Sequence, residues 1–187
     1  MKNFVIVGTS AVGKSFLEDA LVATGRFVAL PKHTSRPPRL GEDPQKTVCL
    51  SSPEFNRLSQ SDQFFFTLTY AGFHYAWKRS DLTKNRQKSI VLPLTLDALA
   101  PFLSQNPNFV PIFLRLTLSG LPLLRRRLSL RASPDLDHRL LLARQEIKKN
   151  ASYSALVQSH HGLVFTIKDD STLPLKVIPA IIAYDQK

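Results

Sequence analysis

The sequence GTSAVGKS, from Gly8 to Ser15, decides the fold of this chain. It fits the pattern G-x-x-x-x-G-K-[ST], a glycine-rich loop that wraps nucleotide phosphates when it follows a strand and opens a helix. The preceding run Phe4–Val7 is apolar and β-branched, as expected of a buried strand. The following stretch Phe16–Ala23 carries apolar residues on one face and is predicted to be a helix that stops at Gly25.

Each part of this loop has a chemical role to play. Backbone N–H groups at the N-terminus of a helix hold anionic oxygens, and the helix dipole adds to the attraction. The Lys14 ammonium is predicted to reach the β- and γ-phosphates, and the Ser15 hydroxyl to help hold Mg²⁺.

Length and composition indicate one globular domain. The chain has 187 residues, of which 43% are hydrophobic and 21% charged, as is typical of a soluble protein with a full core. No apolar run approaches the roughly 20 residues of a membrane helix, and an early first strand argues against a signal peptide. The single Cys49 excludes an internal disulfide framework, so we expect a cytoplasmic protein.

The net charge of +11 is unusual and unevenly distributed. Residues 121–150 contain eight basic and three acidic side chains and therefore supply +5 of it. Such a charge is compatible with a nucleic-acid surface, although no nucleic-acid motif is recognised. A phosphate-handling enzyme also needs a cluster of this kind.

Apolar strand-like runs recur along the chain and are separated by helix-like stretches. This alternation predicts an α/β fold with a parallel sheet and helices on both faces. The runs are Phe4–Val7, Phe27–Leu30, Ile90–Leu94, Phe109–Leu116 and Leu163–Ile167.

Two insertions interrupt this alternation. In the first, His33–Lys46 is predicted to be a polar loop, and a helix is expected to start with Ser52 as N-cap and Pro53 as first helical residue. The same insertion ends in a predicted strand at Phe64–Tyr70. The second is rich in arginine, with a loop expected at 131–135 between two helices. Near the C-terminus, Pro174 and Pro179 argue against one uninterrupted helix.

Further motifs follow the phosphate loop in a recognisable order. Residues His33–Glu42 read HTSRPPRLGE, and Tyr70–Tyr75 read YAGFHY. With the phosphate loop at this spacing, they resemble the guanylate kinase family, whose arginine loop and hairpin tyrosine contact the acceptor phosphate. The resemblance covers nearly the whole chain and extends to Ser51–Phe55, Leu124–Arg131, Arg139–Leu140 and Lys168–Asp170.

The resemblance implies an organisation and an activity. One domain would consist of a P-loop core (1–31, 84–120 and 143–187), an acceptor-binding insert (32–83) and a lid (121–142). ATP with Mg²⁺ would donate its γ-phosphoryl group to a small phosphorylated acceptor, with Ser15 at the metal. The residues implied to bind ATP are Gly8, Thr9, Ser10, Ala11, Val12, Gly13, Lys14 and Ser15.

The arginines suit this chemistry, because phosphoryl transfer depends on positioning and on neutralising spread negative charge. Arg36 and Arg39 would hold the acceptor phosphate with help from the Tyr75 hydroxyl. Arg131 and Arg139 would close on the transferring group and exclude water. The catalytic residues implied are therefore Lys14, Arg36, Arg131 and Arg139.

The departures from the family pattern concern the guanine base. Phe66 stands where the family has a glutamate, and Trp77 where it has serine or threonine. No carboxylate occurs at the end of the run Ile90–Thr95, and a second phosphate-contacting tyrosine is replaced by Thr47 or Val48. Phe66 and Trp77 are expected to line the acceptor pocket, where unpaired base N–H groups would cost roughly 1–3 kcal/mol each. GMP is therefore a doubtful acceptor.

Four functions stay open at this point. The chain is a kinase for a nucleoside monophosphate, or a kinase for another acceptor such as ribose 1,5-bisphosphate, whose kinases resemble guanylate kinases. It is otherwise a binding module, although such modules usually lose the lysine retained here as Lys14. The charge of +11 leaves nucleic acid as a further partner. The sequence does not indicate an oligomeric state.

Overall fold

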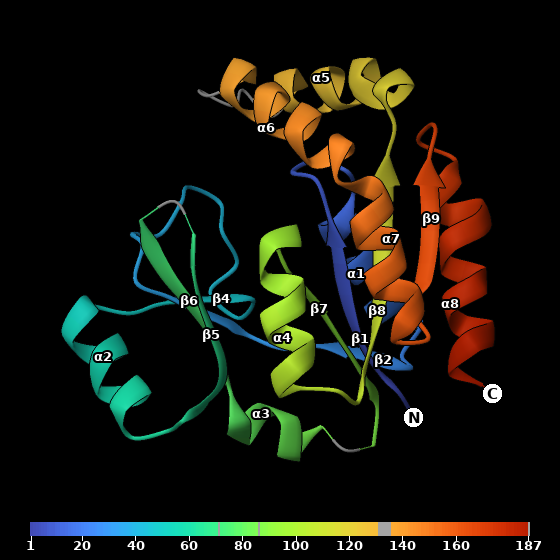
Figure 1. Cartoon of the computed structure of the whole chain (residues 1–187). Helices are drawn as coiled ribbons and strands as arrows, with labels where there is room; N and C mark the ends of the chain where they lie inside the picture. The colour runs from blue at the N-terminus through green and yellow to red at the C-terminus, as the bar shows by residue number, and fades with distance from the viewer. Residues whose placement is uncertain (71, 86, 131–135, 187) are drawn as a thin grey trace.

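The larger of two sheets confirms the predicted parallel arrangement (Figure 1). The computed structural model describes residues 1–70, 72–85, 87–130 and 136–186. The strand order is β2-β7-β1-β8-β9, and every pair of neighbours runs parallel. These strands span Asn3–Gly8 (β1), Phe27–Ala29 (β2), Ser89–Pro93 (β7), Phe109–Leu116 (β8) and Leu163–Ile167 (β9).

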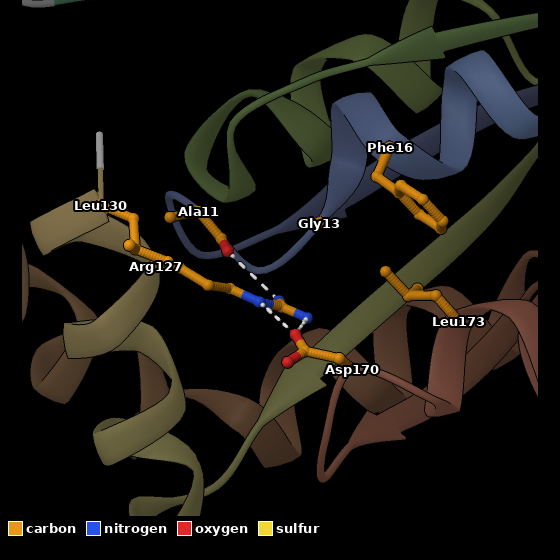
Figure 2. Close-up of a pocket in the computed structure, with 7 residues that line it drawn as sticks. All are labelled: Ala11, Gly13, Phe16, Arg127, Leu130, Asp170 and Leu173. Atoms are coloured by element: carbon orange, nitrogen blue, oxygen red, sulfur yellow. Dashed lines mark hydrogen bonds and ion pairs between the residues drawn. The ribbon is translucent and has the colours of Figure 1, made fainter.

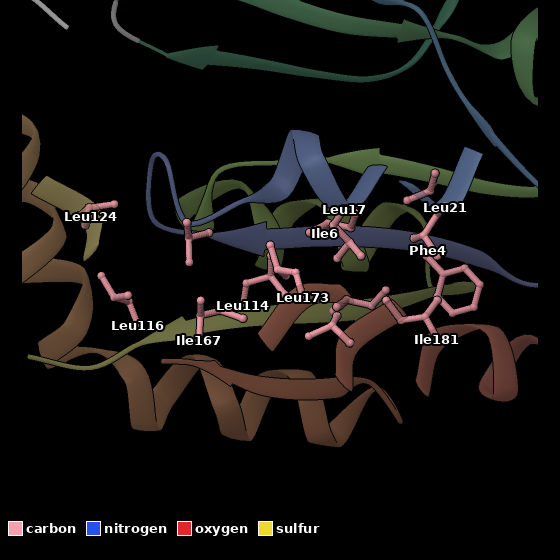
Figure 3. Packing of buried hydrophobic residues seen from close by; sticks show 14 of the residues in the cluster. Phe4, Ile6, Leu17, Leu21, Leu114, Leu116, Leu124, Ile167, Leu173 and Ile181 are labelled. Carbon is pink, nitrogen blue, oxygen red and sulfur yellow. The ribbon is translucent and has the colours of Figure 1, made fainter. Parts of the chain in front are cut away.

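Helices cover both faces of this sheet, and its central strand β1 is therefore buried on both sides. Along β1, Phe4 and Ile6 face one hydrophobic cluster while Val5 and Val7 face another. The first cluster includes side chains of α1 (Lys14–Ala23) and α8 (Ile178–Asp185), as Figure 3 shows. The second includes side chains of α4 (Leu99–Gln105) and α7 (Asn150–Ser159). The alternation fixes β1 at the centre of the fold, directly before the phosphate loop.

A second, four-stranded sheet of order β4-β3-β6-β5 lies beside the first. Its strand β3, Lys32–Thr34, extends two residues into the stretch expected to be a loop, where it pairs with both β4 and β6. The other elements of the insertion are β4 (Thr47–Cys49), α2 (Ser52–Gln60), β5 (Phe64–Tyr70), β6 (Phe73–Lys78) and α3 (Arg79–Lys84).

The start of α2 corrects one prediction. Ser51, not Ser52, is the N-cap: its hydroxyl accepts a hydrogen bond from the Glu54 backbone N–H at 3.3 Å. The helix therefore begins one residue earlier than expected, with Pro53 inside its first turn.

Two helices follow β8 at the end of the sheet where the parallel strands terminate (Figure 1). They are α5 (Leu121–Leu130) and α6 (Leu136–Lys148), preceded by a short 3₁₀ turn at Leu118–Gly120, and another such turn, Leu96–Ala98, precedes α4. The loop predicted at 131–135, with Arg131, lies outside the described residues.

The C-terminal region differs from the expectation. Its chain is helical from Leu173 to Asp185, but the first part, Leu173–Val177, is a π-helix that continues into α8. The two prolines thus mark a change of helix type and not a break, since Pro174 and Pro179 each stand within the first two positions of their segment. Within the described ranges, no helix is long and apolar enough to span a membrane.

Candidate active site

The phosphate loop is shaped by backbone that favours glycine. Gly13, the residue before α1, has φ of +121°, and a Cβ built on it would stand 2.4 Å from Leu173 Cδ1. Ala11 has φ of +61°, in the left-handed region, where a non-glycine residue is held only by its surroundings. The loop is therefore a tightly packed turn with Ala11 and Gly13 at positive φ, as a phosphate-binding loop requires.

Two cations meet at this loop. Lys14 Nζ donates hydrogen bonds to the carbonyl oxygens of Gly8 at 2.5 Å and Thr9 at 3.0 Å. Helix α6 brings Arg139 to the same place, where its Nη1 donates to the Ser10 hydroxyl at 3.0 Å. Two predicted catalytic residues, 125 positions apart in the chain, thus lie against one loop.

A third cation, Arg127 of α5, binds the back of the loop and was not singled out by sequence reasoning. Its Nη1 donates to the Val12 carbonyl at 2.6 Å and to that of Ala11 at 3.3 Å. Its Nε and Nη2 donate to one oxygen of Asp170 at 3.0 and 2.8 Å, as Figure 2 shows. The Arg127 guanidinium holds the pKa of the Asp170 carboxyl below its usual range. The run of arginines signalled a cluster, but not which member reaches the loop.

A pocket of about 280 Å³ opens beside this bridge (Figure 2). Its apolar side is made by Phe16, which is exposed on α1, and by Leu173 and Leu130. Arg127 and Asp170 supply the polar side. A mostly apolar pocket with few polar groups, directly beside a phosphate loop, has the character of a nucleobase site.

A second opening, the cationic cleft, lies between the phosphate loop and the smaller sheet. Its volume is about 260 Å³, and the predicted acceptor residues Arg36, Arg39, Tyr75 and Trp77 line it together with Lys14, Ser15 and Arg139. With Lys32, five cationic side chains line the cleft, and no carboxylate occurs among its described lining residues. The cleft therefore favours a strongly anionic ligand.

The acceptor side of the cleft is organised by strand pairing. Thr34 on β3 pairs with Tyr75 on β6, so the arginine loop that follows β3 leaves the sheet next to Tyr75. Arg36 is only 5% exposed, and its guanidinium contacts the Glu42 carboxylate and donates to the Pro37 carbonyl at 2.8 Å. The same contact raises the pKa of Arg36 and lowers that of Glu42, so both groups stay charged.

The structure does not bring Phe66 to the cationic cleft. Phe66 is 3% exposed and packs edge-on against Phe102 of α4, with ring centroids 4.9 Å apart. Leu68, two residues along the same strand, lines the cleft in its place. A register shift between Phe64 and Phe66 turns both Phe65 and Phe66 toward the core, which sequence alternation alone does not reveal.

The end of β7 has no carboxylate, and the nearest acids lie further along. Pro93 and Thr95 line the cleft, while Asp97 accepts a hydrogen bond from the Tyr153 hydroxyl at 2.8 Å. Glu146 of α6 lines a smaller cavity with Asp97 and Lys14, and burial raises its pKa. In the described part of the chain, no three His, Cys, Asp or Glu side chains could together hold a metal ion. Ser15 is exposed at the cleft, where a Mg²⁺ shared with nucleotide oxygens would fit.

Comparison with known proteins supports a P-loop NTPase fold of the guanylate kinase type. The chain is similar over its entire length to the crystal structure of guanylate kinase from Anaplasma phagocytophilum, with a TM-score of 0.71. The two share 20% sequence identity, and 87% of that chain is covered. No protein-family model and no curated protein sequence matches this chain. The guanylate kinase-like fold is thus shown by structure, while the activity and the acceptor are matters for proposal.

Proposed function

We propose that this protein is an ATP-dependent phosphotransferase that moves the γ-phosphoryl group of ATP to a phosphorylated acceptor. One observation carries the proposal: cations on both sides of one cleft converge on the space above the phosphate loop. Lys14 and Arg139 would hold the donor phosphates, and Arg36 and Arg39 the acceptor phosphate. Phosphoryl transfer needs this arrangement because its main requirements are alignment and charge neutralisation.

The proposed roles follow from the chemistry of each group. Arginine grips phosphate oxygens with paired N–H donors, and Arg36 is already oriented by Glu42 before a ligand arrives. The Tyr75 hydroxyl would add a hydrogen bond to the acceptor phosphate. Arg131 would join Arg139 on the transferring group. Mg²⁺ held by Ser15 would neutralise charge on the β- and γ-phosphates.

We further propose that three parts of the chain divide the work. The core (1–31, 84–120 and 143–187) would hold ATP, with its base in the pocket between Phe16 and Leu173. The insert (32–83) would hold the acceptor, and the lid (121–142) would close over both and exclude water. The contact between Arg127 and the phosphate loop supports the assignment of α5 to the ATP side.

The acceptor is proposed to be a nucleoside monophosphate or a sugar phosphate such as ribose 1,5-bisphosphate. The sugar phosphate is favoured by the part of the cleft where a base would lie. Trp77 and Pro93 line that part and offer no set of hydrogen-bonding groups for a purine edge. A site without polar groups to pair with the edge of a base does not discriminate between bases by hydrogen bonding. GMP is accordingly expected to be a poor acceptor.

The direct test is ADP release from Mg-ATP with a panel of acceptors: GMP, dGMP, AMP, UMP, TMP and ribose 1,5-bisphosphate. Acceptor-dependent release is expected, and Lys14→Ala should lower kcat by about 100- to 1,000-fold. Lys148→Ala, an exposed lysine of α6, serves as the matched control. ATP binding without turnover on any acceptor would contradict the proposal and favour a binding module.

A further inference from the structure

A larger pocket adjoins the cationic cleft and contains charges that the proposed mechanism does not use. Its volume is about 490 Å³. Glu18, one helical turn after Ser15 on α1, faces it together with Lys32 of β3. This pocket and the cationic cleft share three lining residues, Arg36, Arg39 and Trp77, and therefore adjoin each other. We call Arg36 and Arg39 the acceptor-phosphate grip, because they are proposed to hold the acceptor phosphate.

Glu18 and Lys32 differ from the paired charged groups of this pocket. Arg36 is paired with Glu42, and Lys46 with Asp19 at 2.5 Å. Within the described ranges, neither the Glu18 carboxylate nor the Lys32 ammonium makes a hydrogen bond or ion pair with a protein group, although both side chains are half-buried. The two groups attract each other only at a distance, so each keeps hydrogen-bonding capacity in a partly desolvated place that a ligand can complete.

The electrostatics of the pair agree with this view. Burial raises the pKa of Glu18 from 4.5 to about 7, with the neighbouring Asp19 adding to the effect, while Lys32 and Lys46 oppose it. Burial, with the Arg36 and Arg39 charges, lowers the pKa of Lys32. Because Arg36 and Arg39 both lower the pKa of Lys32, Lys32 and its neighbour Glu18 lie beside the acceptor-phosphate grip.

A third group without a partner belongs to the same pocket. Trp77 is 2% exposed, and its indole Nε1–H has no hydrogen-bond acceptor in the described structure. Because less than 1 Å² of this nitrogen is accessible, Trp77 presents the apolar part of its ring to the pocket, and the polar contacts available to a ligand come from the charged groups.

We propose that Glu18 and Lys32 determine acceptor specificity by binding hydroxyl groups of the sugar attached to the acceptor phosphate. A carboxylate accepts hydrogen bonds and an ammonium donates them, whereas each sugar hydroxyl does both. In any phosphorylated sugar or nucleotide, the sugar is the group next to the phosphate, which is where this pair stands. The inference rests on the proposed function, because it takes the Arg36–Arg39 side as the acceptor site.

The ribose of a nucleotide and a free sugar phosphate offer the same hydroxyl chemistry, so the test uses matched probes. Equilibrium binding to the full-length protein is measured by calorimetry for UMP against dUMP, GMP against dGMP, and ribose 1,5-bisphosphate alone. The wild-type protein is expected to prefer the hydroxylated member of a pair by about tenfold or more. The better ligand among UMP, GMP and ribose 1,5-bisphosphate identifies the source of the hydroxyls.

The variants Glu18→Gln and Lys32→Met should each reduce that preference to less than about threefold, with the dissociation constant for ATP unchanged. Asp62→Asn, an exposed carboxylate paired with Arg79, is the control and should keep the preference. Because binding is read separately from transfer, a protein that binds these probes but transfers nothing would refute the proposed function and leave the inference standing. The inference is overturned if both variants keep the wild-type preference, if they change only the choice between UMP and GMP, or if none of the probes binds.

Discussion

At the scale of the residue, the phosphate loop depends on Gly13, where both the backbone conformation and a neighbouring side chain disfavour any residue with a Cβ. Gly13 combines φ of +121° with the close approach of Leu173. Gly25, after α1, also has positive φ, +75°, but a Cβ there would meet nothing within 4 Å. Substitution of Gly25 therefore measures the cost of backbone strain alone, whereas substitution of Gly13 measures backbone strain together with a steric clash.

We therefore expect Gly13→Ala to lower the free energy of unfolding by about 2–4 kcal/mol, because strain and overpacking add. Gly25→Ala should cost only about 1 kcal/mol, from backbone strain alone. Urea unfolding of both variants measures the difference. Equal losses would mean that Leu173 yields without cost.

Arg36 illustrates how a buried charge is prepared for a ligand. Its pairing with Glu42 fixes the guanidinium at the cleft, and a lysine cannot reproduce its paired donors. Arg36→Lys is expected to raise the KM for the best acceptor by about tenfold or more with the KM for ATP unchanged. Arg57→Lys, on the exposed face of α2, should change neither constant. A change confined to ATP would place Arg36 on the donor side instead.

Glu18 links folding to pH. Below its ordinary pKa of 4.5 the carboxyl is protonated in both the folded and the unfolded protein. Between 4.5 and about 7 the unfolded chain releases a proton that the folded state keeps, so the contribution of Glu18 to stability falls as the pH rises. Above about pH 7 the loss is complete.

Glu18→Gln removes this penalty. The melting temperature of the variant, relative to wild type, should therefore be higher at pH 8 than at pH 5. Differential scanning calorimetry at the two pH values measures the shift. A difference that does not depend on pH would show that the Glu18 carboxyl titrates normally in the folded protein.

At the scale of the element, α5 is connected to the phosphate loop through one side chain. Arg127 donates to the loop carbonyls and to Asp170, whereas its neighbour Arg126 contacts only Asp170 among the described residues. The adjacent pair allows the two contacts to be distinguished.

Arg127→Met should weaken ATP binding by about tenfold. The Val12 carbonyl would lose a charged hydrogen-bond donor, and the phosphate loop would lose the contact that holds it against α5. Arg126→Met should leave ATP binding within about twofold, since its contact is exposed. Dissociation constants measured by calorimetry test both. Similar weakening in the two variants would assign the effect to Asp170 and not to the loop.

The sequence predicted elements better than it predicted contacts. Apolar runs located all five strands of the large sheet, most clearly the three inner strands β1, β7 and β8, which are buried along most of their length. Local motifs located Arg36, Arg39 and Tyr75 at the cleft. Glu18 and Lys32, the proposed sugar-binding pair, were not singled out although they flank recognised motifs, because only the tertiary structure brings them together. Arg127 lies in a run of arginines, and only the fold shows which of them reaches the loop. Phe66 was misplaced by a register shift within β5.

At the scale of the whole molecule, five cationic side chains of a chain with a net charge of +11 line one cleft. Five cations in one cleft raise the local concentration of anions, an effect that salt screens. We expect kcat/KM for the best acceptor to fall several-fold between about 50 and 200 mM salt, while kcat changes little. Steady-state kinetics over this range test the expectation. A fall in kcat alone would exclude electrostatic attraction as the cause.

The packing of Phe65 and Phe66 has a mechanical consequence for the β5–β6 hairpin. At that end the strand is anchored to the core, since Phe65 stacks with Phe109 and Phe66 meets Phe102. At the other end, Tyr70 and Phe73 are exposed. The hairpin is thus fixed to the core at its Phe65–Phe66 end and is held further out by β3 and α2, because His74 exchanges hydrogen bonds with Ser35 and stacks on Phe55. A phosphate bound at Tyr75, as proposed, would therefore pull on β3 as well as β6, so the hairpin and the arginine loop after β3 would shift together while the Phe65–Phe66 end stays packed on the core.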